Sequence, residues 1–481
     1  MTSTVHDAIK DAYETIAYVG RPHHPTSPTL LAAIGQLHGL APRTGAPIAM
    51  LEIASGDGSN LLPIAAAHPG GRFVGVDLSA RLTASARELA AALGLANTTL
   101  IEGDLRALPA DIGRFDVIVA HGLYSWVPAD VRDALMRAIA RHLAPAGVAF
   151  VSYNTLPGGW IRKIGFDALK FHTRAITDPA ARVAAAREFV DLLVETWRAQ
   201  PGPGKALAEN FARESARDDG GLFHDDLAAV NEPIYVTGFM RHAAAHRLAV
   251  FADADPASPD PGGADAALIE RYRARGVGME EQILDFVHLR QLRQSLITHA
   301  GARPLARPDP RRAEGLHWAA TAGYVRRRIE GGVPADPVGE TLAARFPATL
   351  SWEELAVSLR GRGAAIADPA TAVHAAWVGG IAEPSTHPIT PAILPSARPR
   401  ASAVARAQAS RVEFIASLRH IGVRLADDTA RTLLPLCDGT RTHAELASAL
   451  VRAGAVAPGA DTAALVERHL AQFASAALFE A

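Results

Sequence analysis

Short apolar runs alternate with amphipathic segments along the first third of the chain. The apolar runs have the length of β-strands and lie at residues 48–53, 72–77, 99–102, 115–121 and 148–153. The segments between them place apolar residues at helical spacing, around residues 61–65, 80–93 and 128–143. Alternating strands and helices predict an α/β fold with a Rossmann-like, doubly wound and mostly parallel sheet.

Beyond residue 160 the apolar spacing is typical of helices. We expect helices over residues 161–199, 205–250 and 280–296, and therefore a helical middle domain. A polar loop at residues 253–263 interrupts this pattern, and five prolines within residues 384–402 predict a linker.

The C-terminal third contains a weak internal repeat. Ser351 with Glu354, and Thr442 with Glu445, each form a capping-box pattern before an apolar helix. A second helical segment follows each of them. Two small winged-helix-like (α+β) modules fit this repeat, and so do two packed helical ends.

The stretch that joins the first apolar run to the first helix carries candidate chemistry. It contains Glu52, Gly56 and Gly58, and the next apolar run ends on Asp77, twenty-one residues after Gly56. Glycines allow a ligand to approach the backbone, and an acid at this distance can bind the hydroxyls of a ribose. The pair predicts a nucleoside-containing cofactor at the carboxyl ends of the strands.

The charge of this loop favours S-adenosylmethionine over a dinucleotide. The dinucleotide fingerprint has a third glycine at the position of Leu61. Glu52 would place negative charge near a pyrophosphate, whereas it suits the ammonium and sulfonium groups of S-adenosylmethionine. The alternative interpretation is an ordinary strand–helix turn in which Ser59 or Asn60 caps the helix.

Several segments resemble the class I S-adenosylmethionine-dependent methyltransferases. They are residues 51–63 for motif I, residues 75–79 and 103–104 for the ribose and adenine loops, residues 121–128 and 151–158 for a bacterial subgroup that carries a methyltransferase regulatory domain, and residues 224–235 and 280–286 for the regulatory domain itself. That subgroup includes lysine methyltransferases that act on outer-membrane proteins. The resemblance implies a methyltransferase whose acceptor is a protein lysine.

We expect the chain to divide into five parts. They are an N-terminal helical lid (1–44), an S-adenosylmethionine-binding methyltransferase domain (45–172), a helical regulatory domain (173–300) and two winged-helix-like modules (310–390 and 403–481). In the lid, Tyr13 and Tyr18 could close over the site.

The expected site residues follow from the strand ends and the resemblance. The cofactor-binding residues are Glu52, Ala54, Gly56, Gly58, Asn60, Asp77, Leu78, Asp104, Leu105 and His121. The catalytic candidates are Tyr124, Tyr153, Asn154 and His121, which we expect to face the crevice. Asp104 would accept a hydrogen bond from the adenine amino group, Tyr153 would bind the incoming amine, and His121 would relay a proton.

Composition excludes some other classes of function. The net charge of −2 gives no global field for nucleic acid or an anionic membrane, and no apolar run reaches the roughly 18 residues of a membrane-spanning helix. The single cysteine, Cys437, predicts a reducing compartment such as the cytoplasm. The histidines show no metal-ligand spacing, and His224 with its two following aspartates has the pattern of an acidic helix start, so we expect no metal.

Three functions remain open from the sequence. The first is methyl transfer to a protein lysine, which suits the large accessory region. The second is a small-molecule or natural-product methyltransferase that uses this region as a homodimer interface. The third is a cofactor-binding regulatory protein without turnover.

Overall fold

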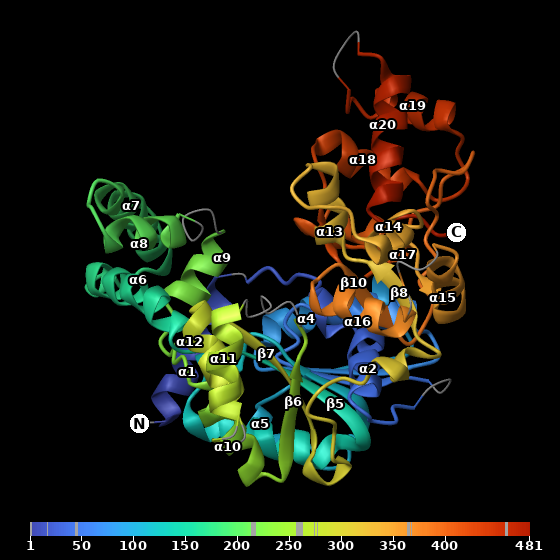
Figure 1. Cartoon of the computed structure of the whole chain (residues 1–481). Helices are drawn as coiled ribbons and strands as arrows, with labels where there is room; N and C mark the ends of the chain where they lie inside the picture. Colours follow the sequence, from blue (N-terminus) through green and yellow to red (C-terminus); the bar gives the residue numbers. More distant parts are fainter. Residues whose placement is uncertain are drawn as a thin grey trace.

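The structure, a computed structural model, describes residues 2–16, 18–43, 47–212, 218–255, 263–273, 275–276, 278–362, 366, 368–456 and 460–481. A seven-stranded sheet forms its base (Figure 1). The strands are β1 (Ala49–Ile53), β2 (Arg72–Asp77), β3 (Thr98–Glu102), β4 (Phe115–Ala120), β5 (Leu143–Asn154), β6 (Leu248–Asp253) and β7 (Leu292–His299). Their order is β3-β2-β1-β4-β5-β7-β6, with β1 to β5 parallel and β7 antiparallel to both of its neighbours.

Helices cover both faces of this sheet, as the alternating pattern predicts. The N-terminal helices are α1 (Thr2–Thr15), α2 (Pro28–Leu37), α3 (Leu61–Ala67), α4 (Ala80–Ala92) and α5 (Ala129–His142). Successive residues of β1 belong to opposite cores, because Met50 packs with α2 and α3 while Leu51 packs with α5. The central strands are therefore buried on both faces, which explains their continuous apolar runs.

The middle region is largely helical but also completes the sheet. Its helices are α6 (Gly158–Thr173), α7 (Pro179–Arg198), α8 (Pro203–Phe211), α9 (Asp219–Gly221), the π-helical turn η4 (Leu222–Asp226), α10 (Val236–Ala245), α11 (Gly263–Arg273) and α12 (Met279–His288). β6 begins at Leu248, inside the expected helix over residues 205–250. β7 begins at Leu292, so the expected helix over residues 280–296 is wrong in its second half.

The edge of β5 explains why β7 is a strand and does not continue the helix α12. α12 ends at His288, and Leu289 then adopts a left-handed φ of 48°. From there the chain runs back along β5, with Ser295 opposite Val151. A short run with Leu296 and Ile297 suits a helix or a strand, and the open edge of β5 decides in favour of a strand. β5 also contains residues 143–147, ahead of the predicted apolar run at residues 148–153.

Two small modules follow the sheet domain. The first contains β8 (His317–Ala320), α13 (Ala322–Ile329), α14 (Pro337–Ala343), β9 (Leu350–Ser351), α15 (Trp352–Arg360), α16 (Pro369–Val378) and β10 (Ala382–Ser385). The second contains α17 (Ala403–Gln408), β11 (Phe414–Ala416), β12 (Gly422–Arg424), α18 (Asp428–Leu436), α19 (His443–Arg452) and α20 (Thr462–Ser475). Both predicted capping boxes are present, at the start of α15 and of α19.

The expected linker between these modules is packed against them. Pro384 lies in β10, which pairs with β8. The backbone amide of Ala401 donates to the carbonyl of Cys437, and Pro391 forms a bridge with Glu480. The prolines therefore belong to an ordered connection, because the neighbouring strands and helices supply its hydrogen bonds.

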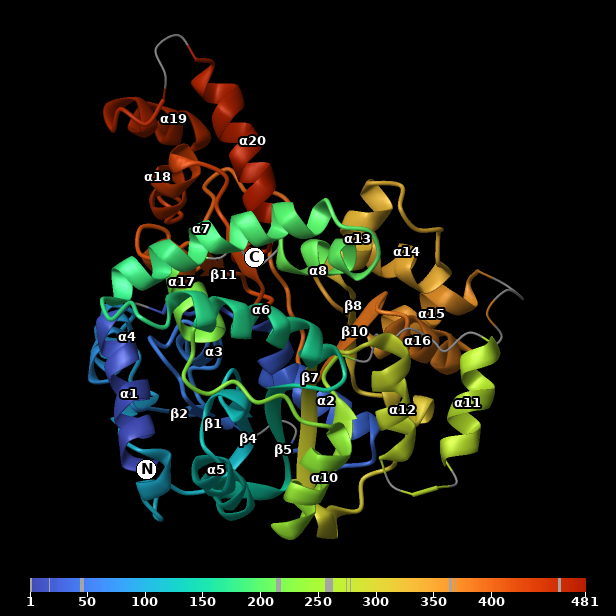
Figure 2. The ribbon, with the colours of Figure 1, turned by 90° about the vertical axis from the view of Figure 1, so that its left-hand side faces the viewer.

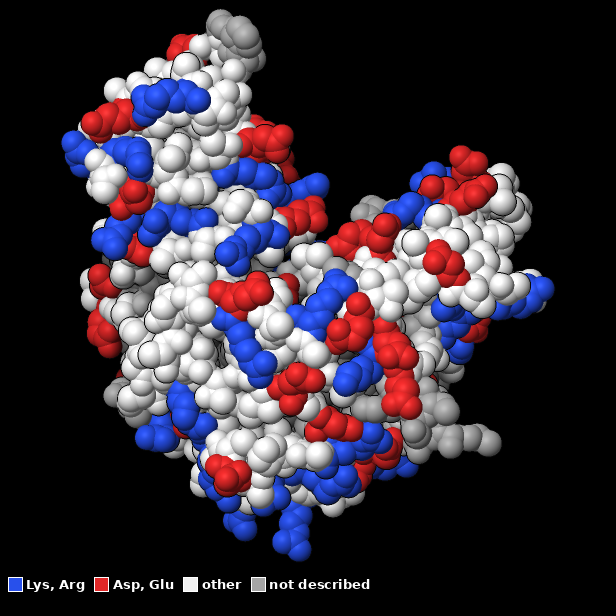
Figure 3. Space-filling view, turned by 180° about the vertical axis from the view of Figure 1, so that it is seen from behind, with Lys and Arg blue, Asp and Glu red and all other residues white. Residues whose placement is uncertain are grey.

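The molecule has two projecting lobes above the sheet. One is formed by α6, α7 and α8 and the other by the C-terminal module, while a second view places α1 beside α4 (Figure 2). Figure 3 shows a hollow between the lobes, with basic and acidic side chains mixed on that face. Among the described residues, no helix combines the length and the apolar character that crossing a membrane requires.

Candidate functional site

A cavity of about 500 Å³ lies at the carboxyl ends of β1, β2 and β4. β1 has β2 on one side and β4 on the other, so the direction of the chain crossovers reverses there. Such a switch point leaves a crevice beyond the strand ends. The predicted cofactor-binding residues that line this cavity are Glu52, Ala54, Gly56, Asn60, Asp77, Leu78, Asp104, Leu105 and His121.

Left-handed residues bring the loop after β1 against the cavity. Ala54 has φ of 61° and Gly56 has φ of 55°. A Cβ added to Gly56 would meet no atom within 4 Å, so the left-handed φ and not a lack of space favours glycine here. Gly58 has another role, because its Cβ would lie 2.8 Å from Leu62 Cδ1. Gly58 lies outside the cavity lining and allows close packing of α3, which corrects its expected place beside the cofactor.

Glu52 and Asn60 form a buried polar pair beneath this loop. Glu52 Oε1 accepts a hydrogen bond of 2.8 Å from Asn60 Nδ2, whereas the buried Glu52 Oε2 has no hydrogen-bond partner. Burial raises the pKa of Glu52 to about 8. A cationic group beside Oε2 would favour the charged carboxylate, which suits the ammonium of S-adenosylmethionine.

Asn60 also joins three distant parts of the chain. Its side chain makes no capping hydrogen bond to α3, which rules out the capping interpretation for this residue. Asn60 Oδ1 instead accepts a hydrogen bond of 2.8 Å from the backbone amide of His23 and lies 2.8 Å from Nε2 of His420. Because His420 belongs to the second module, the C-terminal part of the chain contacts the motif loop directly.

Asp77 closes the loop at the end of β2. Its carboxylate accepts hydrogen bonds from the backbone amides of Gly56 at 2.8 Å and of Ser79 at 2.9 Å. Ser79 caps α4 by accepting a hydrogen bond from the amide of Leu82. Burial raises the pKa of Asp77, and the two amide donors oppose that effect. The remaining lone pairs of the carboxylate can accept hydrogen bonds from two ribose hydroxyls.

Asp104 lines the cavity but already has a charged partner. Its Oδ2 lies 2.7 Å from Nη2 of Arg106, which also contacts Asp130. An adenine amino group would therefore share this carboxylate with Arg106. The adenine role of Asp104 remains a prediction.

His121 stacks on His23, a lining residue that the sequence did not indicate. The ring centroids are 3.8 Å apart, and Nδ1 of His121 lies 2.9 Å from Ser152 Oγ. Burial lowers the pKa of His121 to about 4 and lowers that of His23 well below its usual value. Both rings are neutral near pH 7 and are weak bases, so they suit a wall of the site better than a proton relay.

The other three catalytic candidates lie outside the cavity lining. Tyr153 is fully buried, stacks on Phe239, and places its hydroxyl 3.0 Å from Ser295 Oγ. Tyr124 is also buried, and Asn154 donates a hydrogen bond to Asn231. These positions correct the expectation that the three residues face the crevice, because the antiparallel β7 and the helix α10 cover this end of the sheet.

Two other tyrosines line the cavity instead. Tyr13 stacks on His224 with a centroid distance of 4.2 Å, and Tyr18 packs edge-on against the same ring at 5.6 Å. Glu14 anchors α1 through a hydrogen bond of 2.8 Å from Ser79 Oγ. Both tyrosines therefore line the cavity, as expected for residues of an N-terminal lid. Movement of such a lid remains a prediction.

Acidic residues of the middle region complete this wall. Asp218 and Asp225 line the cavity beside Tyr18. The sequence signal was the pair of aspartates after His224, which is also typical of an acidic helix start. Only the packing of α1 against η4 shows that one of them reaches the cavity.

The cavity as a whole is acidic. Among the described residues, its lining contains the carboxyl groups of Glu52, Asp57, Asp77, Asp104, Asp218 and Asp225 and one guanidinium, that of Arg21, which lies 3.8 Å from Asp218. Low-dielectric walls strengthen such a field. The site therefore favours cationic ligands and disfavours phosphates.

Three segments match known protein families. Residues 50–147 match a methyltransferase domain, residues 218–299 match the predicted methyltransferase regulatory domain, and residues 397–478 match the PKMT C-terminal winged helix domain. These segments correspond to the sheet with its motif loops, the acidic wall with β6 and β7, and the second small module.

Solved structures and curated proteins extend this comparison. The structure of PKMT2 from Rickettsia typhi superposes with a TM-score of 0.83 at 20% identity, covering 96% of this chain and 100% of that one, and a second structure of it contains AdoHcy. The uncharacterized protein RP789 of Rickettsia prowazekii is 30% identical over 300 residues, which are 62% of this chain and 54% of that protein. RP028 of the same organism is 29% identical over 239 residues, which are 49% of this chain and 94% of that protein. The chain thus spans about half the length of RP789.

Together the fold, the cavity and these matches define the class. The chain carries an S-adenosylmethionine-dependent methyltransferase domain, followed by a methyltransferase regulatory domain and a PKMT winged-helix domain. It shares the fold of PKMT2 over nearly its whole length.

Proposed function

We propose that this protein transfers a methyl group from S-adenosylmethionine to the side-chain nitrogen of a lysine in a protein substrate. The observation that carries the proposal is the acidic cavity with two different walls. One wall contains the motif loop, Asp77 and Asp104. The other contains Tyr18, Asp218 and Asp225 and suits a cationic acceptor.

The accessory regions and their relatives support a macromolecular acceptor. The PKMT name denotes a lysine methyltransferase, and both the winged-helix match and the fold match carry that name. The hollow between the two lobes leaves an open face beside which a macromolecular acceptor could lie (Figure 3). A homodimer and a cytoplasmic location remain predictions from the sequence.

Each wall has a distinct task in this reaction. When bound, S-adenosylmethionine supplies an electrophilic methyl group on a sulfonium. Glu52 and Asp77 hold its ammonium and its ribose, which fixes the direction of that methyl group. The carboxylates of Asp218 and Asp225 attract the lysine as a cation. Because they also favour its charge, the desolvation of the amine on burial has to outweigh them before its proton leaves to solvent. The neutral nitrogen forms its bond to the methyl carbon as the bond from that carbon to sulfur breaks.

The decisive experiment measures binding and transfer together. Calorimetric titration with S-adenosylmethionine would come first, followed by incubation of the enzyme with methyl-labelled cofactor and a cell lysate. Label in a protein band, recovered as methyllysine after acid hydrolysis, is the expected result. The Asp77→Ala variant is the control for cofactor-dependent transfer.

Other results would replace the proposal. Label in the small-molecule fraction would indicate a small-molecule methyltransferase. Label in protein on a residue other than lysine would contradict the acceptor assignment. Absence of cofactor binding would contradict the role of the whole motif loop.

A further inference from the structure

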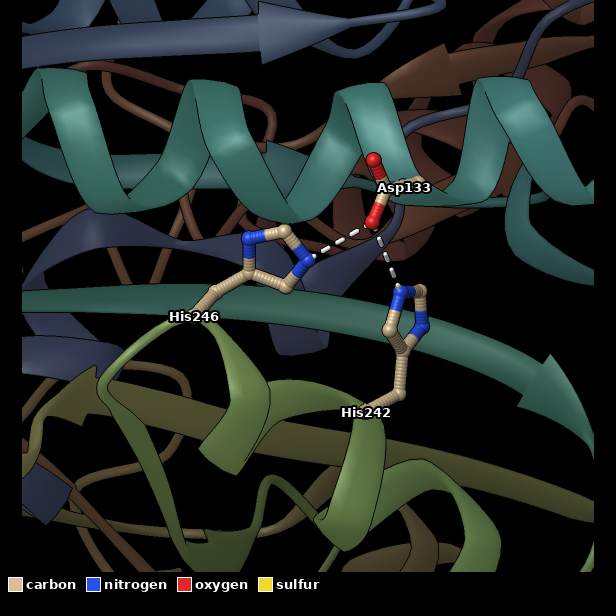
Figure 4. Close-up of side chains that lie close together, drawn as sticks. All are labelled: Asp133, His242 and His246. Carbon is tan, nitrogen blue, oxygen red and sulfur yellow. Dashed lines mark hydrogen bonds and ion pairs between the residues drawn. The ribbon is translucent and has the colours of Figure 1, made fainter.

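Outside the cavity lining, helices α5 and α10 face each other with metal-ligating side chains. Asp133 comes from α5, His242 from the last turn of α10, and His246 from the residue that follows α10 (Figure 4). In the described part of the chain, these three form the one group of histidine, cysteine or acidic residues whose ligand atoms all lie within 4.8 Å of one another.

The ligand atoms converge on one point. Nε2 of His246 lies 2.8 Å from Asp133 Oδ1, and Nε2 of His242 lies 3.6 Å from the same oxygen. The two histidines are four residues apart, so they share one face of the helical turn. Ligands about 2.1 Å from a tetrahedral ion are roughly 3.4 Å from one another, close to the 3.6 Å separation of His242 and Asp133. The shorter contact of His246 with Asp133 is a hydrogen bond, which a bound ion would replace.

A buried hydroxyl orients one of the imidazoles. The hydroxyl of Tyr124 lies 2.7 Å from Nδ1 of His242, on the side of the ring opposite Asp133. Metal-binding histidines generally use their second nitrogen in such a contact, which fixes the ring orientation and the tautomer. This contact gives the buried Tyr124 a role in orienting the ring of His242.

The charge of Asp133 and the donor set also suit a metal ion. Asp133 forms an ion pair with Arg137 through Oδ2, which leaves Oδ1 for the imidazoles. Two imidazole nitrogens and one carboxylate oxygen are a donor set preferred by zinc and similar transition metals over calcium or magnesium.

We propose that Asp133, His242 and His246 bind a divalent transition-metal ion of the zinc type, with its fourth position open to water. Local histidine spacing did not indicate this site, because its third ligand, Asp133, lies on a helix more than 100 residues away in the chain.

Such an ion would bridge two domains. α5 belongs to the segment that matches the methyltransferase domain and α10 to the segment that matches the regulatory domain. α10 also packs against β5, where Phe239 stacks on Tyr153 with ring centroids 4.1 Å apart. The ion would therefore fix the position of the regulatory domain, which supplies Asp218 and Asp225, relative to the sheet. This inference is independent of the proposed methyl acceptor.

The test uses the full chain without a tag, after treatment with a chelator. Zinc chloride is added, free ion is removed by desalting, and bound zinc is measured by plasma mass spectrometry. We expect one equivalent per chain, with an increase in melting temperature. Cobalt chloride should give the visible absorption of a tetrahedral site. His246→Gln and Asp133→Asn should each lower the affinity at least about tenfold and abolish that absorption.

Two control variants separate ligation from general effects. His443→Gln removes another imidazole–carboxylate pair, with Glu467, and should bind zinc like the wild-type chain. Arg137→Gln removes the other partner of Asp133 and should bind zinc at least as tightly. If the ligand variants fail to fold, Tyr124→Phe should weaken binding about tenfold with all three ligands in place. No zinc bound by the wild-type chain, or equal zinc in His246→Gln and the wild-type chain, would overturn the proposal.

Discussion

The two walls of the cavity are built in different ways. The cofactor wall consists of loops that directly follow β1, β2 and β3, and backbone amides hold its key acid, Asp77. The opposite wall joins α1 to η4, segments about 200 residues apart, through the stack of Tyr13 on His224. A local turn motif thus specifies one wall, whereas tertiary packing assembles the other. We expect changes in the first wall to alter cofactor binding and changes in the second to alter acceptor use.

The attachment of the regulatory domain to the sheet should show the largest effect. Asp285 on α12 is fully buried and accepts a hydrogen bond of 2.8 Å from Nη2 of Arg293 on β7. Asp285→Ala would leave a buried guanidinium without this partner, which should lower the free energy of unfolding by about 3–5 kcal/mol. Urea denaturation measures this loss.

The second acid beside Arg293 provides the matched control. Glu281 Oε2 lies 2.8 Å from Nη2 of Arg293, but its side chain is 43% exposed. Glu281→Ala should therefore cost at most about 1 kcal/mol. Equal losses in the two variants would show that burial does not distinguish these pairs.

The pH dependence of stability probes the cofactor wall. Glu52 has a pKa of about 8 in the folded chain, against about 4.3 when unfolded. Between these values the folded state holds a proton that the unfolded state has lost, so the contribution of Glu52 is complete below about pH 4 and is lost as the pH rises towards 8. From pH 5 to 7 the cofactor-free wild-type chain should lose about 1–3 kcal/mol relative to Glu52→Gln, measured by urea denaturation.

An exposed acid tests whether this slope belongs to Glu52. Glu88 lies on the solvent side of α4, and Glu88→Gln should follow the wild-type pH curve. Parallel curves for Glu52→Gln and the wild-type chain would contradict the raised pKa.

Removal of the ribose-binding acid should act on affinity. Asp77→Ala should weaken binding of S-adenosylmethionine by about 1–3 kcal/mol, because charge-assisted hydrogen bonds are lost. Calorimetric titration measures this change. Asp130→Ala is the control, because Asp130 contacts Arg106 from outside the cavity lining. Unchanged affinity in Asp77→Ala would remove this residue from the ribose role.

A pair of tyrosines gives the smallest and most specific contrast. Tyr18 is 37% exposed at the cavity, whereas Tyr153 is fully buried beside Ser295. Tyr18→Phe should raise KM for the acceptor several-fold with little change in stability. Tyr153→Phe should lower the free energy of unfolding by about 1 kcal/mol, since one buried hydrogen bond is lost, and should leave KM unchanged. A fall in kcat for Tyr153→Phe without loss of stability would restore its expected catalytic role.

The sequence predicted the central sheet well because its signals are local. β2 lies at the predicted residues, and both predicted capping boxes are present. Each of these features depends on residues only a few positions apart. The wrong prediction, the second half of the helix over 280–296, concerns a segment whose hydrogen-bond partners, on β5 and β6, lie far away in the chain.

The sequence by itself determined the cofactor class, because the charge of Glu52, the glycine turn and the distance to Asp77 are properties of a single short stretch. Only the tertiary structure decided which side chains face the cavity. β7 and α10 cover Tyr124 and Tyr153, while α1 brings Tyr18 to the cavity. The physical reason is that hydrogen bonds within a turn fix local geometry, whereas exposure depends on what the rest of the chain packs against.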